Sequence, residues 1–136
     1  MKRVGFIVML VMCCMACGKT GDAVPNVGVN FEASLTDPRF SALKSIGGAV
    51  IVNGYGVAGL IIYHSAYGYV AYDRCSSYMP QNKCAVTLDN PSLTATDPCS
   101  GAKFSLTDGT PVKAPATRSL KQYAVNVNTF EIFVSN

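Results

Sequence analysis

Three cysteines and one aspartate in the second half of the sequence carry side chains that often do chemistry. Cys75, Cys84 and Cys99 offer thiols, and Asp97 offers a carboxylate two residues before the last of them. Thiolates bind soft metals and form disulfides, whereas carboxylates bind harder ions and transfer protons. The sequence holds a single histidine, His64. These residues limit the reactions that the chain can support.

Zinc binding and thiol chemistry are two alternatives for the cysteines. Zinc binds sets of three cysteines and one histidine, which Cys75, Cys84, Cys99 and His64 would provide, but no short C-x-x-C pair is present. A reactive Cys75 would need a nearby cation to lower its pKa. The adjacent Arg74 would point the opposite way in an extended chain. A passive thiol, or one that forms a mixed disulfide, is the simpler interpretation.

Two further groupings also have a simpler structural alternative. Asp73 and Asp97 could serve as paired carboxylates for acid–base catalysis, but nothing in the sequence brings them together, and Asp before Pro commonly forms a turn. A group of tyrosines could form a stacking surface for a glycan or a peptide, but such side chains more often form cross-strand pairs in a sheet. These tyrosines are Tyr55, Tyr63, Tyr67, Tyr69, Tyr72 and Tyr78.

The segments around these residues have the patterns of β-strands. Residues 49–53, 58–64 and 68–73 are rich in Val, Ile and Tyr and are separated by glycine turns, which is typical of a meander. Residues 121–127 and 130–134 both alternate apolar and polar side chains, which predicts a hairpin. The core of the domain is therefore predicted to be a β-sheet.

The remaining segments predict little regular structure. Residues 31–43 predict a short strand followed by a helical turn, because an Asp-Pro pair prevents a long helix. Residues 74–85 and 94–103 carry the cysteines and have little β character. We therefore expect one all-β domain with two cysteine-bearing loops.

This layout resembles the Rieske iron–sulfur domain. In that family a C-x-H pair in one loop and a C-P-x-H-G pair in the next hold a two-iron two-sulfur cluster. The resemblance covers residues 47–134, and it is closest to the Rieske-like lipoproteins of the Bacteroidetes lineage, in which the ligands are often replaced. It implies small antiparallel sheets with two loops at one end tied by a disulfide. The matching run after the second loop comprises Phe104, Asp108-Gly109, Pro115-Ala116, Leu120, Tyr123 and Val125.

Only one of the four cluster ligands is present when the family pattern is carried over. Cys75 falls on the first cysteine and Ser77 on the first histidine, while Asp97 replaces the second cysteine and Ser100 the second histidine. A shifted alignment puts Cys99 at a ligand position, but the proline and glycine of the motif then lose their places. A thiolate, two hydroxyls and a carboxylate do not make a Rieske site. We therefore expect no metal and no cofactor, and a two-iron two-sulfur cluster only if this ligand assignment is wrong.

The other two cysteines match a disulfide that ties the two loops together in some Rieske proteins, notably those of cytochrome bc complexes. The resemblance thus implies a Cys84–Cys99 disulfide, which would contribute roughly 3 kcal/mol in the chain-entropy model. A Cys75–Cys99 pair and three free thiols are the alternatives. The second loop also keeps the residues that shape it, namely Pro98, Gly101, Phe104 and Gly109.

The first nineteen residues differ from the rest. Two basic residues precede an apolar run that is too short for a membrane span but is typical of a secretory signal. Cysteines at its end suggest a lipoprotein, with the lipid on Cys17 after the small Ala16; Cys14 and Cys13 are weaker candidates. An ordinary cleaved signal or an uncleaved anchor is the alternative.

The expected organisation is a signal peptide at 1–16, a lipidated terminus and tether at 17–30, and the β domain at 31–136. Acyl chains would hold the exported domain at the cell envelope, on the outer membrane or the periplasmic face. Beyond the signal, basic and acidic residues nearly balance and form no basic cluster, which disfavours a nucleic-acid partner.

The sequence therefore predicts a cluster-less Rieske-like lipoprotein that is not an enzyme. We expect it to act as a binding or accessory module with a protein partner in the envelope. The alternative is a Rieske-type electron carrier with atypical ligands.

Overall fold

The computed structural model describes residues 23–136. The predicted signal peptide at 1–16, the predicted lipidation residue Cys17 and its alternatives lie outside the described residues. Within residues 23–136, no helix has the length and apolar character needed to cross a membrane.

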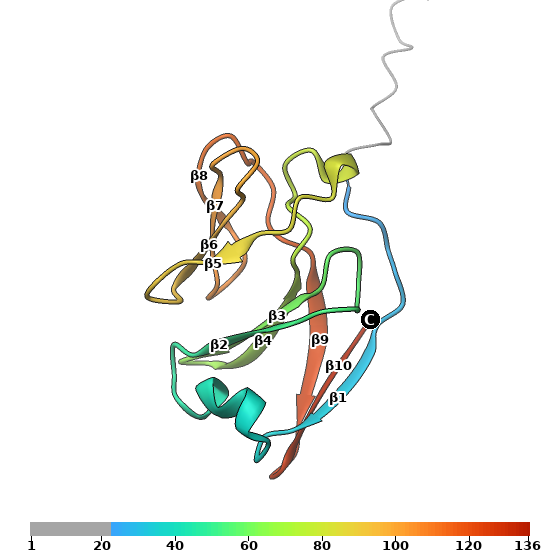
Figure 1. Ribbon diagram of the computed structural model, residues 1–136, viewed down its shortest axis with the longest axis vertical. Helices are drawn as coiled ribbons and strands as arrows, with labels where there is room; N and C mark the ends of the chain where they lie inside the picture. Colours follow the sequence, from blue (N-terminus) through green and yellow to red (C-terminus); the bar gives the residue numbers. More distant parts are fainter. Residues whose placement is uncertain (1–22) are drawn as a thin grey trace, which may run out of the picture.

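The larger part of the domain is a curled antiparallel sheet of six strands (Figure 1). Its strand order is β1-β10-β9-β4-β3-β2, so the C-terminal hairpin inserts between the first strand and the meander. The predicted meander, hairpin, first strand and helical turn are confirmed, with ends that differ by at most two residues. The elements are β1 (Asn30–Ser34), the 3-10 helix η2 (Pro38–Lys44), β2 (Ala49–Val52), β3 (Leu60–Ser65), β4 (Gly68–Asp73), β9 (Gln122–Val127) and β10 (Glu131–Ser135).

A second, four-stranded sheet carries the two cysteine-bearing loops. It follows a short 3-10 helix, η3 (Pro80–Asn82), and its order is β5-β6-β7-β8. Our prediction that residues 94–103 have little β character was wrong at both ends, because β6 occupies Thr94–Thr96 and pairs with β7, which begins at Lys103. The strands are β5 (Thr87–Leu88), β6 (Thr94–Thr96), β7 (Lys103–Ser105) and β8 (Pro111–Lys113).

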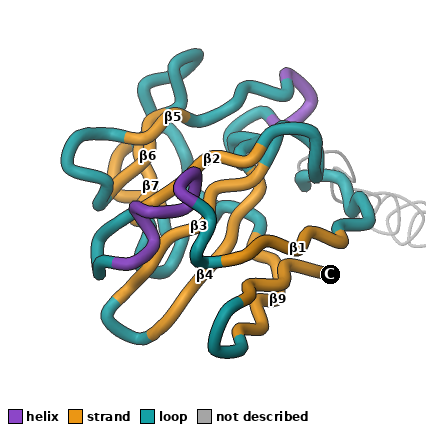
Figure 2. Tube along the Cα trace, turned by 60° about the horizontal axis from the view of Figure 1, so that its bottom comes forward, coloured by secondary structure: helices purple, strands orange, loops and turns teal. Residues whose placement is uncertain are grey.

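Strand β3 separates two hydrophobic cores. Its residues Leu60 and Ile62 face a core inside the curled sheet, and Ile61 and Tyr63 face a core shared with the small sheet. All four are buried, which explains the continuous apolar run of this strand. Figure 2 shows η2 lying across β2 and β3, where Phe40 closes the first core.

The first described segment, residues 25–34, lies beside the C-terminal strand at the edge of the larger sheet. β1 pairs with β10 over its whole length, and the Val29 amide donates to Asn136 Oδ1 at 2.9 Å. Lys121 Nζ donates to the Pro25 carbonyl oxygen at 3.2 Å. Residues 25–30, which we expected to belong to the tether, therefore lie against the domain.

Candidate functional site

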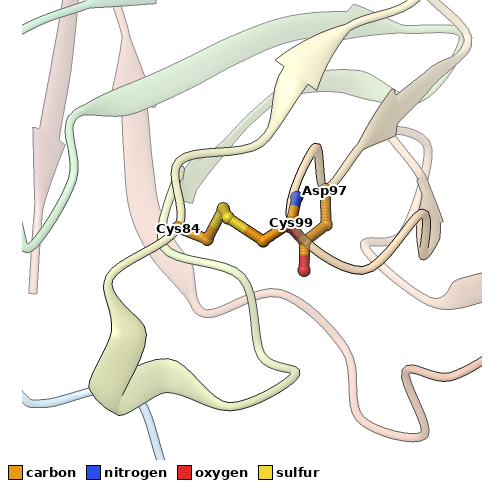
Figure 3. Close-up of side chains that lie close together, drawn as sticks. All are labelled: Cys84, Asp97 and Cys99. Atoms are coloured by element: carbon orange, nitrogen blue, oxygen red, sulfur yellow. A yellow bond between two sulfur atoms is a disulfide. The ribbon is translucent and has the colours of Figure 1, made fainter.

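The two cysteine-bearing loops lie at one end of the molecule and are joined by a disulfide (Figure 3). Cys84 and Cys99 are bonded, with their Cα atoms 6.4 Å apart. The predicted pairing is confirmed, and the alternatives with a Cys75–Cys99 bond or three free thiols are wrong. Cys84 is buried, whereas Cys99 is exposed. The disulfide therefore joins a buried residue of the first loop to a solvent-exposed residue of the second.

Asp97 is the centre of a second connection between the loops. Its Oδ2 accepts hydrogen bonds from Ser76 Oγ and Ser100 Oγ, each at 2.7 Å, and its Oδ1 accepts one from the Cys99 amide at 2.8 Å. Ser76 belongs to the first loop, so one carboxylate links both loops. Only 1% of Asp97 is exposed. A carboxylate at this depth is stabilised only if donors surround it, and here they do.

The pKa of Asp97 results from two opposed effects. Burial raises the pKa of the carboxyl, because the charged form loses its hydration. The hydroxyls of Ser100 and Ser76 and the amides of Cys99 and Ser100 stabilise the carboxylate and together outweigh burial, so the pKa lies below its usual value. Asp97 is thus an anion at neutral pH whose oxygens are already used by protein donors.

Cys75 is a buried thiol without reactive character. Its thiol points to the carbonyl oxygen of Pro80 at 3.5 Å, and its amide donates to Asp73 Oδ1 at 2.8 Å. Burial, and then the negative charge of Asp73, raises the pKa of the Cys75 thiol to about 11, although Lys83 opposes the shift. The thiol is therefore protonated at neutral pH, and the candidate role of Cys75 as a nucleophile is not supported.

The four positions carried over from the Rieske pattern do not share one set of hydrogen-bond partners. Ser100 and Asp97 are bonded to each other. Ser77 instead donates to the Arg118 carbonyl oxygen at 2.6 Å, and Cys75 turns toward Pro80. Ser76, which we did not single out, is the residue of the first loop that reaches Asp97.

The second loop keeps its shape through its backbone. Gly101 has a φ of 79° and its amide donates to the Asp97 carbonyl oxygen at 2.8 Å. Gly109 has a φ of 78°, and a Cβ there would lie 2.7 Å from Tyr72 Cε1. Pro98 is exposed beside the disulfide, and Phe104 is fully buried in the second core.

The alternative sites that we considered less favoured from the sequence do not form among residues 23–136. The His64 ring stacks on Tyr69 with centroids 4.2 Å apart, and its Nδ1 is 2.8 Å from the Leu43 carbonyl oxygen, so it takes no part in a zinc site. Asp73 has its own partners, the amides of residues 57, 58 and 75 and the Tyr123 hydroxyl, and is not paired with Asp97. The tyrosines do not form one surface, since Tyr63 and Tyr72 are buried.

Comparison with known proteins identifies the fold. No protein-family model and no curated protein matches the sequence. Among solved structures, the cyanobacterial plasma membrane Rieske protein from Synechocystis PCC 6803 is 24% identical over 82% of this chain and 100% of that one, with a TM-score of 0.54. The chain has a Rieske-like fold. A structure of the complex of reduced oxygenase and oxidized ferredoxin in carbazole 1,9a-dioxygenase matches with 24% identity over 79% of this chain and 99% of that one, with a TM-score of 0.50.

The residues of the two loops do not fit the cluster of a Rieske protein. Such a cluster needs two thiolates and two imidazoles. Here the only histidine is remote and bonded elsewhere, the Cys75 thiol points to the Pro80 carbonyl oxygen, and the oxygens of Asp97 are bonded to the two loops. Among residues 23–136, the one group of three potential metal ligands is Cys84, Asp97 and Cys99, and two of these are consumed by the disulfide.

Proposed function

We propose that this chain is a Rieske-fold protein without an iron–sulfur cluster that acts as a non-catalytic binding or accessory module. The observation that carries the proposal is the bonding of Asp97, which stands where the family has a cluster cysteine. Its carboxylate joins Ser76 of the first loop to Ser100 and Cys99 of the second. Hydrogen bonds and a disulfide thus perform the structural task of the cluster, which is to hold the two loops together.

The location that we propose rests on the N-terminal sequence. An apolar run followed by cysteines supports export and attachment of a lipid at Cys17. A domain held at a membrane surface by acyl chains is suited to bind a protein partner of the cell envelope. The near balance of charges beyond the signal argues against a nucleic-acid partner.

Iron and acid-labile sulfide in the purified full chain test this proposal. The chain is prepared anaerobically and its visible spectrum is recorded, with an established two-iron two-sulfur protein prepared in parallel as the control. We expect a colourless, folded protein without iron. About two irons and two sulfides per chain, with a visible band, would contradict the proposal.

Electron transfer is the second candidate, because the similar solved structures include a Rieske protein and a complex that contains a ferredoxin. It would require a cluster with atypical ligands or ligands from a partner. The same iron measurement separates the two functions. Neither function makes the chain a stand-alone enzyme.

A further inference from the structure

The larger sheet is open between its two edge strands, β1 and β2, and a groove of about 620 Å³ lies there. Residues 31–34 of β1 form one side, and residues 51–53 at the end of β2 form the other. Phe31, Phe40 and Tyr55 close its floor: the Phe31 ring lies 5.1 Å from that of Tyr55 and 6.0 Å from that of Phe40. We call this feature the edge groove.

The β1 side of the edge groove presents unused backbone groups. The Leu35 amide donates to the Phe130 carbonyl oxygen at 2.7 Å, which identifies this pair as hydrogen-bonded. Because hydrogen-bonded pairs alternate along an antiparallel ladder, Phe31 and Ala33 bond to β10. The N–H and C=O of Glu32 must therefore point away from β10, toward the groove.

The β2 side of the edge groove also presents backbone groups that do not bond within the sheet. The His64 amide donates to the Gly48 carbonyl oxygen at 2.9 Å, so by the same alternation Val50 and Val52 bond to β3 and the backbone of Ile51 points away from it. Strand β2 has the sequence AVIV, without a charge or a proline that would protect an edge. The Ile51 side chain is 38% exposed.

Three charged side chains line the edge groove, namely Glu32, Asp37 and Arg39. Arg39 and Asp37 pair with each other at 2.7 Å, and the other ion pair among residues 23–136, Lys103–Asp89, also leaves out Glu32. The occupant must therefore complement the charge of Glu32. The Glu32 carboxylate is exposed and has no hydrogen-bond partner within the described part of the chain. A cationic side chain on a neighbouring strand would therefore pair with it.

We propose that the edge groove binds an extended segment of a partner protein as an added β-strand, with alternating apolar side chains and a lysine or arginine opposite Glu32. This inference rests on the proposed function as a binding module and names the surface used. Main-chain hydrogen bonds to the outward backbone groups of Ile51 and Glu32 would supply affinity. The ion pair with the Glu32 carboxylate would fix the register of the added strand.

Two other occupants fit the geometry less well. A second copy of the domain would have to bring an edge strand into a groove that has a wall on each side, whereas a single extended segment has no such obstacle. The first described residue, Ala23, does not line the groove but lies with Ser77, Arg118 and Lys121 near the cysteine loops.

The test is an NMR titration of the full chain with blocked heptapeptides of alternating valine and threonine, one with a central lysine and one with a central glutamate. We expect the lysine peptide to shift the amides of Ile51 and Glu32. Ile51→Pro removes the outward N–H while sparing the ladder to β3, and should weaken binding about tenfold. Val112→Pro, at an exposed bulge on the edge of the small sheet, is the matched control and should bind normally.

A charge exchange tests the register. Glu32→Lys should weaken the lysine peptide about threefold and strengthen the glutamate peptide by a similar factor. The proposal is wrong if neither peptide binds, if Ile51→Pro binds as well as the unsubstituted chain, or if the shifts lie at the cysteine loops. It is also wrong if, in the absence of peptide, a second copy or the N-terminal residues already bond to the outward backbone groups of Ile51 and Glu32. None of these results alters the iron content, so failure here is distinguishable from failure of the proposed function.

Discussion

Replacing Asp97 with alanine removes the acceptor of hydrogen bonds from Ser76, Ser100 and the Cys99 amide, of which the bond from Ser76 joins the two cysteine loops. Ser76 is fully buried, so its hydroxyl would lose its partner without gaining water. Ser100 and Cys99 lie nearer the surface and can be rehydrated. One buried donor left unsatisfied and two hydrogen bonds exchanged for water cost together about 3 kcal/mol. We therefore expect Asp97→Ala to lower the free energy of unfolding by about this amount at pH 7.

The loss should depend on pH in a defined direction. The pKa of Asp97 lies below its usual value in the folded chain, so ionised Asp97 stabilises the fold above the unfolded pKa of about 3.9. This stabilisation disappears as the pH falls through the folded pKa. The difference between the unsubstituted chain and Asp97→Ala should therefore be constant near neutral pH and shrink below about pH 4.

Urea unfolding with the disulfide intact measures this difference. Tyrosine fluorescence can report it, because the sequence contains no tryptophan. Asp108→Ala is a matched control, since Asp108 is exposed and its hydrogen bonds, from the Thr110 amide and hydroxyl and from Ser105, join no residue of the two cysteine loops. If Asp97→Ala destabilises the chain no more than Asp108→Ala does, the carboxylate does not link the loops.

Three further predictions concern the same end of the molecule. Cys84→Ser removes the disulfide and should lower the free energy of unfolding by roughly 3 kcal/mol in urea titrations, with little effect of dithiothreitol on the variant. Cys75 should resist iodoacetamide at pH 7.5 in the folded chain and react in urea, as followed by mass spectrometry of its peptide; rapid labelling of the folded chain would contradict the buried, protonated thiol. Gly109→Ala should lower the melting temperature more than Gly101→Ala, because only Gly109 has the Tyr72 ring where the new methyl would lie; equal losses would mean that the ring moves aside.

Much of the larger sheet could be predicted from the sequence because its strands are four to six residues long and carry local patterns. The small sheet could not, because its strands have two or three residues. Thr94–Thr96 has no distinctive pattern, and it is a strand because β5 and β7 pair with it on both sides. The pairing of β4 with β9 likewise joins Ala71 to Tyr123, far apart in the sequence.

The candidate site was predictable in part. The disulfide and the positions of Asp97 and Ser100 followed from the resemblance to Rieske domains. The role of Ser76 did not, because the choice between two adjacent serines depends on an isolated β-bridge between Cys75 and Ala85 that orients the loop. Cys75, which forms this bridge, is also fully buried, and a sequence pattern for ligands cannot reveal that.

The pairing of β1 with β10 has a consequence for how the chain reaches its folded state. Asn30 lies opposite Ser135, so β1, which is synthesised near the start of the domain, can pair only after β10 at its end has been synthesised. Until residues 131–135 are available, β1 has no neighbour in the sheet, and the first core lacks Ile132 and Val134. The strands β2, β3 and β4 can pair with one another as the chain emerges, but the larger sheet is complete only after β9 and β10 have joined them to β1.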